Sequence, residues 1–296
     1  MQNYQSAQGY SGDARNEDVL VYLNGAFVHR DEASVSVFDS GFVLGDGVWE
    51  GLRLVNGSLL SVDLHMDRLF EGARVISLDL GMTRGEVVAA IMETCARNGF
   101  ADGAHVRLMV TRGRKATPNQ DPRFTIGGPT MVIVAKLKAP RFNASDKGLT
   151  LFTSSYRCST PDVFDLRLNS HSRLNLIQAL IQAIAAGADE ALMLDPLGFV
   201  ASCNSTNFFI VRKGELWTST GKYSFNGITR GRVLDLFSRH LGPARQLDFT
   251  LAQAYSADEA FLTGTLGGVT PVTRIDGHTI GAGTTGPLTR ELTRIY

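Results

Sequence analysis

Two residue periodicities alternate irregularly along this chain, and that mixture restricts the fold more than any single motif does. Strand-like alternation occurs at Val19–Phe27 and Glu50–Leu60, each with an Asn-Gly hairpin turn. Apolar residues at helical spacing follow at 64–78 and Arg84–Arg97, and a further helix is predicted at Arg173–Ala186. Because these patterns do not repeat as strict βαβ units, the sequence predicts an α+β fold.

The chain is long enough for two domains and contains one linker candidate. Its 296 residues can fill two well-formed cores. Residues 1–18 are polar and rich in Gln, Asn, Ser and Gly, which is typical of a flexible tail. A proline-containing polar stretch at 139–145 is the linker candidate. We therefore predict a small N-terminal α/β domain at 19–138 and a larger C-terminal domain at 146–296.

Composition argues against nucleic acid, membrane and metal as partners. Lys plus Arg and Asp plus Glu number 29 each, so no net charge draws the chain to polyanions. No apolar run approaches the ~20 residues of a membrane span, and residues 1–18 lack the apolar core of an export signal. Cys95, Cys158 and Cys203 lie far apart without metal-ligand spacing. Reduced thiols and a cytoplasmic location are expected.

Four short stretches contain residue types that bind anions or line small-molecule sites. The glycine-rich DSGFVLGDGVWEGLR occupies Asp39–Arg53, and HMDRL occupies His65–Leu69 on the first long predicted helix. NGITR at Asn226–Arg230 precedes a helix, where backbone amides and the helix dipole favour a phosphate. TGTLGGVTP at Thr263–Pro271 follows a strand and can form an anion nest. Each stretch alone is more typical of an ordinary turn, cap or surface segment.

Together, and joined by GADEALMLDPLGFV at Gly187–Val200, the four stretches resemble the class IV aminotransferases. That family includes the branched-chain and D-amino acid aminotransferases and aminodeoxychorismate lyase. The resemblance runs from about Val19 to the C-terminus. It implies a two-domain, fold type IV pyridoxal-phosphate enzyme of the D-amino acid aminotransferase-like kind. It also implies an amino acid or 2-oxo acid as substrate, and a homodimer.

The resemblance supplies most of a phosphate-binding cup and part of a substrate pocket. Arg68 matches the arginine that grips the cofactor phosphate, a role that suits its charge and fork geometry. Trp49 and Gly51 match positions that line the substrate pocket. The other positions that match the cofactor cup are Ile228, Thr229, Gly264 and Thr265. The loop that often holds the substrate carboxylate in this family contains Arg114, Lys115 and Arg123. Arg114 and Arg123 are equal candidates for that carboxylate.

The residue that anchors the cofactor in this family is missing. Counted back from Gly187 without a gap, the Schiff-base lysine falls on Asn169, and the following residues Ser170–Asn175 fit the family pattern. No lysine occurs between Lys147 and Lys213, so no local shift of register supplies an amine. The arginines in the segment stay protonated and do not form a Schiff base.

A second departure affects the same chemistry. Counted forward from the GADEAL stretch, the glutamate that keeps the pyridine nitrogen protonated falls on Ser202, beside Cys203. Two such losses indicate a changed function, although an engineered Lys→Asn substitution stays open. Pyridoxal phosphate would then bind noncovalently, with Ser202 at its edge, or be absent.

His171 and Cys203 are the candidate replacements for the lost chemistry. If the segment is extended, Asn169 and His171 share one face, where a histidine can act as a general base; the alternative is a structural histidine. Cys203 is either a nucleophile or a buried small hydrophobe.

Three functions stay open. The favoured one is an enzyme that binds a phosphorylated ligand and an amino or oxo acid. The others are a cofactor-independent lyase or hydrolase using His171, Cys203 or Lys115, and a non-catalytic homologue.

Overall fold

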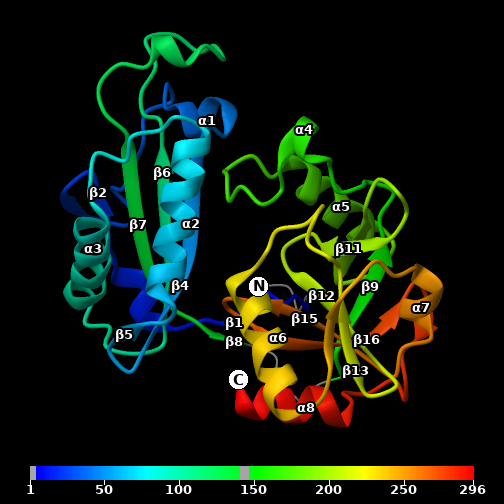
Figure 1. Ribbon diagram of the computed structural model, residues 1–296. Coiled ribbons are helices and arrows are strands. Elements are labelled where there is room, and N and C mark those ends of the chain that lie inside the picture. Colours follow the sequence, from blue (N-terminus) through cyan, green and yellow to red (C-terminus); the bar gives the residue numbers. More distant parts are fainter. Residues whose placement is uncertain (1–4, 141–146) are drawn as a thin grey trace. The chain divides into compact units, whose positions relative to one another are not determined.

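Two compact units, each with its own sheet and core, make up the chain. The computed structural model describes residues 5–140 and 147–296. The N-terminal unit holds Ser11–Ala139 and Leu168–Arg173, and the C-terminal unit holds the described residues outside these two ranges (Figure 1). The chain therefore returns to the N-terminal unit for six residues that the sequence assigned to the C-terminal domain. Most of the predicted linker, residues 141–145, lies outside the described residues.

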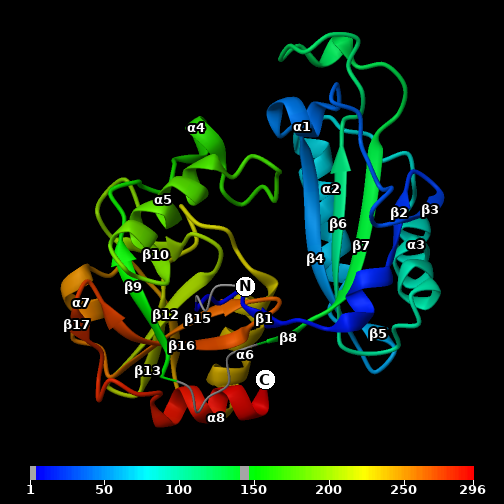
Figure 2. The same cartoon turned by 180° about the vertical axis from the view of Figure 1, so that it is seen from behind.

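A six-stranded antiparallel sheet forms the N-terminal unit. Its strand order is β3-β2-β7-β6-β4-β5. The long helices α2 and α3 pack against the central strands (Figures 1 and 2). The strands are β2 (Leu20–Leu23), β3 (Ala26–His29), β4 (Gly47–Val55), β5 (Ser58–Leu59), β6 (Ala104–Thr111) and β7 (Thr130–Leu137). The helices are η1 (Ala14–Asp18), α1 (Ser40–Leu44), α2 (Val62–Val75), α3 (Arg84–Arg97) and η2 (Pro122–Phe124).

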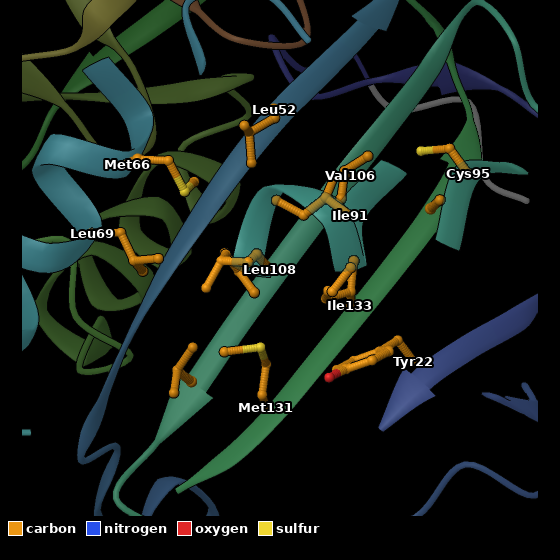
Figure 3. Packing of buried hydrophobic residues seen from close by; sticks show 14 of the residues in the cluster. Tyr22, Leu52, Met66, Leu69, Ile91, Cys95, Val106, Leu108, Met131 and Ile133 are labelled. Carbon is orange, nitrogen blue, oxygen red and sulfur yellow. The ribbon is translucent and has the colours of Figure 1, made fainter. Parts of the chain in front are cut away.

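One face of this sheet is apolar because alternate residues of its strands point to the same side. Leu108 of β6 and Ile133 of β7 pack with Leu69 of α2 and Ile91 of α3 in one buried cluster (Figure 3). The intervening residues point to the opposite side, which we call the polar face. It includes Trp49, Gly51 and Arg53 of β4, His105 and Arg107 of β6, and Lys136 of β7.

A nine-stranded mixed sheet forms the C-terminal unit, with the order β11-β10-β9-β16-β15-β12-β13-β14 and β17 paired to β16. β9 is parallel to β10 and β16, whereas most other pairs are antiparallel. The strands are β9 (Leu149–Thr153), β10 (Glu190–Leu194), β11 (Val200–Cys203), β12 (Asn207–Arg212), β13 (Glu215–Thr218), β14 (Ala244–Gln246), β15 (Glu259–Gly264), β16 (Gly268–Ile275) and β17 (His278–Thr279). The helices are α4 (Pro161–Phe164), α5 (Leu174–Ala185), α6 (Ile228–His240), α7 (Leu251–Tyr255) and α8 (Pro287–Ile295). Two short strands, β1 (Tyr10–Ser11) and β8 (Ala139–Pro140), pair with each other.

The described residues of the predicted flexible tail are folded. Ser6 Oγ and Ala7 N donate to the buried carboxylate of Glu190 on β10, at 2.7 and 3.0 Å. Ala7 is buried in the core of the C-terminal unit, and Asn16 bonds both the N–H and the C=O of Leu137. The prediction for residues 5–18 is thus corrected, because a buried carboxylate requires donors and this polar segment supplies them.

Neither a membrane helix nor a metal centre occurs in residues 5–140 and 147–296. No helix there is long and apolar enough to cross a bilayer. No group of three or more His, Cys, Asp or Glu side chains there is placed to hold a metal ion. The cytoplasmic location stays a prediction.

Candidate functional site

A buried carboxylate organises the candidate site residues of the N-terminal unit. Glu50 lies on the apolar face of β4 and is 0% exposed. Arg68 on α2 donates Nε and Nη2 to its two oxygens at 2.7 Å each, and His65 Nδ1, one helical turn earlier, lies 2.7 Å from Oε2. Burial alone raises the pKa of Glu50, but the hydrogen bonds from Arg68 and His65 bring it below its usual value. Arg68, which the resemblance assigns to the cofactor phosphate, is therefore held by a charged partner that sequence reasoning missed.

The segment that contains Asn169 runs beside β4 as a short added strand. Trp49 N donates to Asn169 O, and His171 N donates to Gly47 O, both at 3.0 Å. A Cβ on Gly47 would lie 2.4 Å from the carbonyl oxygen of Val110 and 2.6 Å from His171 Cδ2. Only glycine fits there, and its absence of a side chain lets the segment approach the sheet.

Asn169 is fully engaged in hydrogen bonds. Its Nδ2 donates to the carbonyl oxygen of Trp49 and, at 3.3 Å, to Glu50 Oε1. Its Oδ1 accepts from Arg173 Nη2, and the residue is 3% exposed. Desolvation, followed by the charges of Arg107 and Arg68, lowers the pKa of Arg173 to about 10. The amide thus serves as a neutral bridge between an acid and a guanidinium, and its nitrogen is not a nucleophile.

His171 differs from Asn169 in having an unused ring nitrogen. Its Nε2 is buried and makes no hydrogen bond within residues 5–140 and 147–296. Burial lowers the pKa of His171, and a hydrogen bond with the backbone of Val48 raises it by a smaller amount. The imidazole is therefore neutral at neutral pH and has a lone pair that can accept a proton.

The Trp49 ring forms a platform for two guanidinium groups. Arg107 lies 3.8 Å and Arg173 5.5 Å from the ring centroid. Gly51, one of the predicted pocket residues, lies beside this platform. A Cβ there would lie 3.5 Å from His105 Nε2 and 3.6 Å from Trp49 Cζ3. Sequence reasoning did not select Arg107, because its only signal was a basic residue at an alternating strand position.

The three basic residues of the loop predicted to hold the substrate carboxylate differ in their exposure to solvent. Arg114 is exposed, and Arg123, also exposed, forms a bidentate pair with Asp121. Lys115 is 1% exposed, and its Nζ donates to Asp121 O at 2.9 Å. Its amine therefore supports the loop from inside.

In the C-terminal unit, Asn207 joins three of the predicted cofactor-cup segments. It pairs with Thr263 across β12 and β15, next to Gly264 and Thr265. Its Oδ1 accepts from Gly227 N at 3.2 Å and its Nδ2 donates to Phe225 O at 2.6 Å, which fixes the loop that begins α6 at Ile228 and Thr229. The same Nδ2 lies 3.4 Å from Ser202 Oγ. Sequence reasoning missed Asn207.

This part of the site is neutral and rich in donors. Thr206 Oγ1 and Thr263 Oγ1 are buried and make no hydrogen bond with any residue the structure describes. A Cβ on Gly264 would lie 3.3 Å from Thr206 Cγ2, so these groups are close together. The hydroxyl of Thr263 lies on the strand that Asn207 connects to the start of the 13-residue helix α6, and an unused donor there is suited to an anion.

Cys203 lies in the core of the C-terminal unit. It is buried in an apolar cluster, and desolvation, followed by the charge of Glu190, raises its pKa well above the usual value. The described thiols Cys95, Cys158 and Cys203 are all free. Cys203 therefore fits the alternative of a small buried hydrophobe better than that of a nucleophile.

Comparison with known proteins now identifies the family. The model of the amino-transferase class IV family matches residues 47–275. This chain belongs to the class IV aminotransferases. Branched-chain-amino-acid aminotransferase-like protein 2 of Arabidopsis thaliana is 38% identical over 281 residues, which are 95% of this chain and 50% of that protein. The chain thus spans half the length of that relative.

Two further relatives match along nearly their whole length. A putative branched-chain-amino-acid aminotransferase of Methanocaldococcus jannaschii is 38% identical over 92% of this chain and 93% of its own. A solved T.th. branched-chain amino acid aminotransferase with pyridoxamine 5'-phosphate has a TM-score of 0.87 at 32% identity, covering 94% of this chain and 93% of its own. The predicted aminotransferase family and its fold type IV, α+β architecture are confirmed.

Proposed function

We propose that this class IV aminotransferase binds an amino acid or a 2-oxo acid together with noncovalently held pyridoxal phosphate, and does not use a Schiff-base lysine. The observation that carries the proposal is the hydrogen-bonded state of Asn169. Its donors are directed to Trp49 and Glu50 and its acceptor to Arg173, so the position is a folded part of the sheet edge. The only lysine in the predicted substrate loop, Lys115, has its amine buried against a backbone carbonyl.

The residues of the C-terminal unit fit the phosphate of pyridoxal phosphate. The unused hydroxyls of Thr206 and Thr263, the amides at the start of α6 and the residues Gly264 and Thr265 would hold it. The covalent attachment does not fit, because an amide cannot replace an amine. When bound, pyridoxal phosphate supplies an electron-withdrawing ring that stabilises negative charge on the substrate.

Ser202 weakens that effect. Its Oγ donates to Thr206 O at 2.9 Å and is neutral. A hydroxyl cannot hold a proton on a pyridine nitrogen as a carboxylate does. Ordinary transamination is therefore not proposed as the main reaction.

We assign the α-carboxylate of the substrate to Arg107. Its guanidinium stacks on Trp49 and makes no hydrogen bond with any residue in the described part of the chain, which leaves its donor fork for a carboxylate. Gly51 keeps a side chain from entering the contact between Trp49 and His105.

We assign proton exchange at the substrate Cα to His171, whose buried Nε2 is available and neutral. General-base catalysis of this kind typically contributes about 10²–10⁴-fold. His171→Asn should lower the exchange of a substrate α-proton for deuterium by a factor in that range, as NMR in D2O would measure. The native rate should rise with pH until it passes a pKa below 6.5 and then level off. An unchanged rate in His171→Asn would overturn this assignment.

Reduction with borohydride tests the central proposal. The native chain with pyridoxal phosphate should keep its unmodified mass after reduction, although dialysis shows saturable binding. Asn169→Lys is the matched positive control and should gain one reduced cofactor adduct at residue 169. A stoichiometric adduct on any lysine of the native chain would refute the proposal. Absence of cofactor binding would favour a cofactor-independent enzyme or a non-catalytic protein. The cofactor-independent alternative is weakened because Cys203 and Lys115 are buried.

We also propose that the chain forms a homodimer through helix α5. The helix contains no charged residue. Its exposed apolar side chains have the 3-4-3 spacing of a coiled-coil seam. Such a seam can pack against the same seam of a second copy across a two-fold axis. Light scattering should give a dimer mass at micromolar concentration, and Ile181→Glu should give a monomer. The four residues are Leu174, Ile177, Ile181 and Ile184, with exposed fractions of 68%, 51%, 59% and 62%.

A further inference from the structure

The start of the described chain lies against the loop that we predict to hold the cofactor phosphate, and the proposed function does not use it. A Cβ on Gly264 would lie 3.3 Å from Nε2 of Gln8, and a Cβ on Gly267 would lie 2.7 Å from the carbonyl oxygen of Ala7. A side chain at residue 267 would therefore displace the backbone of Ala7. Residues 6–8, which we call the strap, thus pack closely on two glycines of the loop at 263–271.

A buried carboxylate anchors the strap. Glu190 of β10 is 1% exposed, and its Oε1 accepts from Ser6 Oγ at 2.7 Å and from Ala7 N at 3.0 Å. Its Oε2 accepts from Asn204 Nδ2 at 2.7 Å. Because a buried carboxylate requires donors, the strap and the segment between β11 and β12 are tied to the same group. That segment also contains Thr206, so Glu190 connects the strap with the predicted phosphate cup.

Gln8 is the strap residue with a side-chain donor to spare. Its backbone N–H donates to Ser6 Oγ at 3.1 Å, and Gly9 N donates to Ser6 O at 2.8 Å, so Gln8 lies within a closed turn. The side chain of Gln8 is exposed and makes no hydrogen bond with residues 5–140 and 147–296. A fixed backbone therefore presents a free amide group, which has two N–H donors.

The strap brings this amide to the unused hydroxyls of the C-terminal unit. Gln8 Nε2 and Thr206 Cγ2 each lie 3.3 Å from the position that a Cβ of Gly264 would occupy. Thr206 is 7% exposed and Thr263, which precedes Gly264 on β15, is 2% exposed. The hydroxyls of both threonines are buried and make no hydrogen bond with the part of the chain that the structure describes. Because buried polar groups without partners are costly, these hydroxyls indicate a ligand, and Gln8 supplies a further donor beside them.

We infer that Gln8 is a further residue that binds the cofactor phosphate. The inference rests on the proposed function, in which the C-terminal unit holds the phosphate of pyridoxal phosphate. The side-chain amide of Gln8 donates an N–H to a phosphate oxygen, and the negative charge of the acceptor strengthens this hydrogen bond. The coupling is reciprocal, so a bound phosphate also holds the strap on the loop.

Equilibrium dialysis of the full chain with pyridoxal phosphate tests this inference. Gln8→Ala should raise the Kd about ten-fold, as expected for the loss of one hydrogen bond to a charged group. Gln8→Glu keeps the length of the side chain but adds a negative charge beside the phosphate, so its Kd should rise further. Gln5→Ala is the matched control, because it removes another exposed glutamine of the same segment, and it should leave the Kd unchanged.

Two outcomes of the dialysis would overturn the inference and leave the proposed function intact. One is an equal Kd for the native chain and Gln8→Ala, and the other is an equal rise in Gln8→Ala and Gln5→Ala. If the native chain does not bind pyridoxal phosphate at all, the proposed function fails, and the inference fails with it.

Hydrogen exchange distinguishes a contact with phosphate from a purely structural role of the strap. The amides of Ala7, Gln8 and Gly9 should exchange more slowly in the native chain when pyridoxal phosphate is bound, because a ligand that contacts the strap stabilises its docked form. Pyridoxal, which lacks the phosphate, should not slow them. Gln8→Ala saturated with pyridoxal phosphate should lose this protection. Exchange that pyridoxal phosphate leaves unchanged in the native chain, or slows equally in Gln8→Ala, would overturn the inference.

Discussion

The two units carry different kinds of chemistry. In the N-terminal unit the candidate site is built from charges, with Glu50, Arg68, Arg107 and Arg173 connected through buried hydrogen bonds and a tryptophan platform. In the C-terminal unit the corresponding groups are neutral hydroxyls, amides and backbone donors around Asn207. A charged network leaves a buried charge without its partner when one member is removed, whereas the loss of one member of a neutral donor set costs only its own hydrogen bonds.

That difference bears on the proposed absence of a Schiff-base lysine at residue 169. A lysine at residue 169 would add a cation to a region that already holds Arg68, Arg107 and Arg173 around one acid. Asn169 instead accepts from Arg173 and donates toward Glu50, so no buried polar group there loses a partner. The proposed phosphate cup is made from other residues and does not include that position.

The largest expected loss of stability comes from removing the acid of the charged network. Glu50→Ala leaves the cation of Arg68 without its main partner and should lower the free energy of unfolding by about 3–5 kcal/mol. Urea denaturation would measure the loss. Glu93→Ala, which breaks the exposed pair with Arg97 on α3, is the control and should change stability by about 0.5 kcal/mol or less. Equal losses in the two variants would contradict a stabilising role of the buried charged network of the N-terminal unit.

The next effect concerns pH. The folded pKa of His105 is about 3, below its ordinary 6.5, so the unfolded chain takes up a proton that the folded chain does not. Stability should therefore fall as pH falls below 6.5, by about 2 kcal/mol at pH 5 from this residue, until the loss ends near pH 3. His105→Gln should flatten this part of the pH profile in thermal or urea unfolding. His240→Gln, at an exposed position, should leave it unchanged.

A smaller effect is expected in the C-terminal unit. Asn207→Ala removes the bonds to Phe225 O and Gly227 N and should lower the free energy of unfolding by about 1–2 kcal/mol. It should also weaken the binding of pyridoxal phosphate measured by equilibrium dialysis, because the start of α6 loses its support. Asn175→Ala on α5 serves as the control. Unchanged cofactor binding would show that the neutral region is not the phosphate cup.

The smallest effect tests the platform. Trp49→Phe keeps an aromatic face for Arg107 but loses the hydrogen bond from Nε1 to Ser170 O, which is 2.9 Å long. The expected loss of stability is about 1 kcal/mol, with little change in affinity for a 2-oxo acid. Trp49→Leu also removes the ring and should weaken that affinity. If both variants bind equally well, Arg107 does not need the platform.

The sequence anticipated the fold class and the family for identifiable reasons, and it supplied the candidate site positions, which stay predictions. Local periodicity separates strands from helices, and Arg68, Thr229 and Gly264 lie in contiguous motifs. Glu50, Asn207 and Arg107 were missed because their roles come from partners far away in the chain. Residues 5–18 were misjudged because a polar segment reads as disordered until its partner, here Glu190, is known.

By itself, the sequence determined that no lysine lies close to residue 169 along the chain, because the interval between Lys147 and Lys213 contains none in any register. It also determined the order of the motifs that we predict to bind phosphate. Only the tertiary structure decided that Asn169 is tied into the edge of β4 and that Arg53, His105 and Lys136 form one row. The physical reason is that cross-strand register joins residues dozens of positions apart, and no local pattern encodes which of them will face each other.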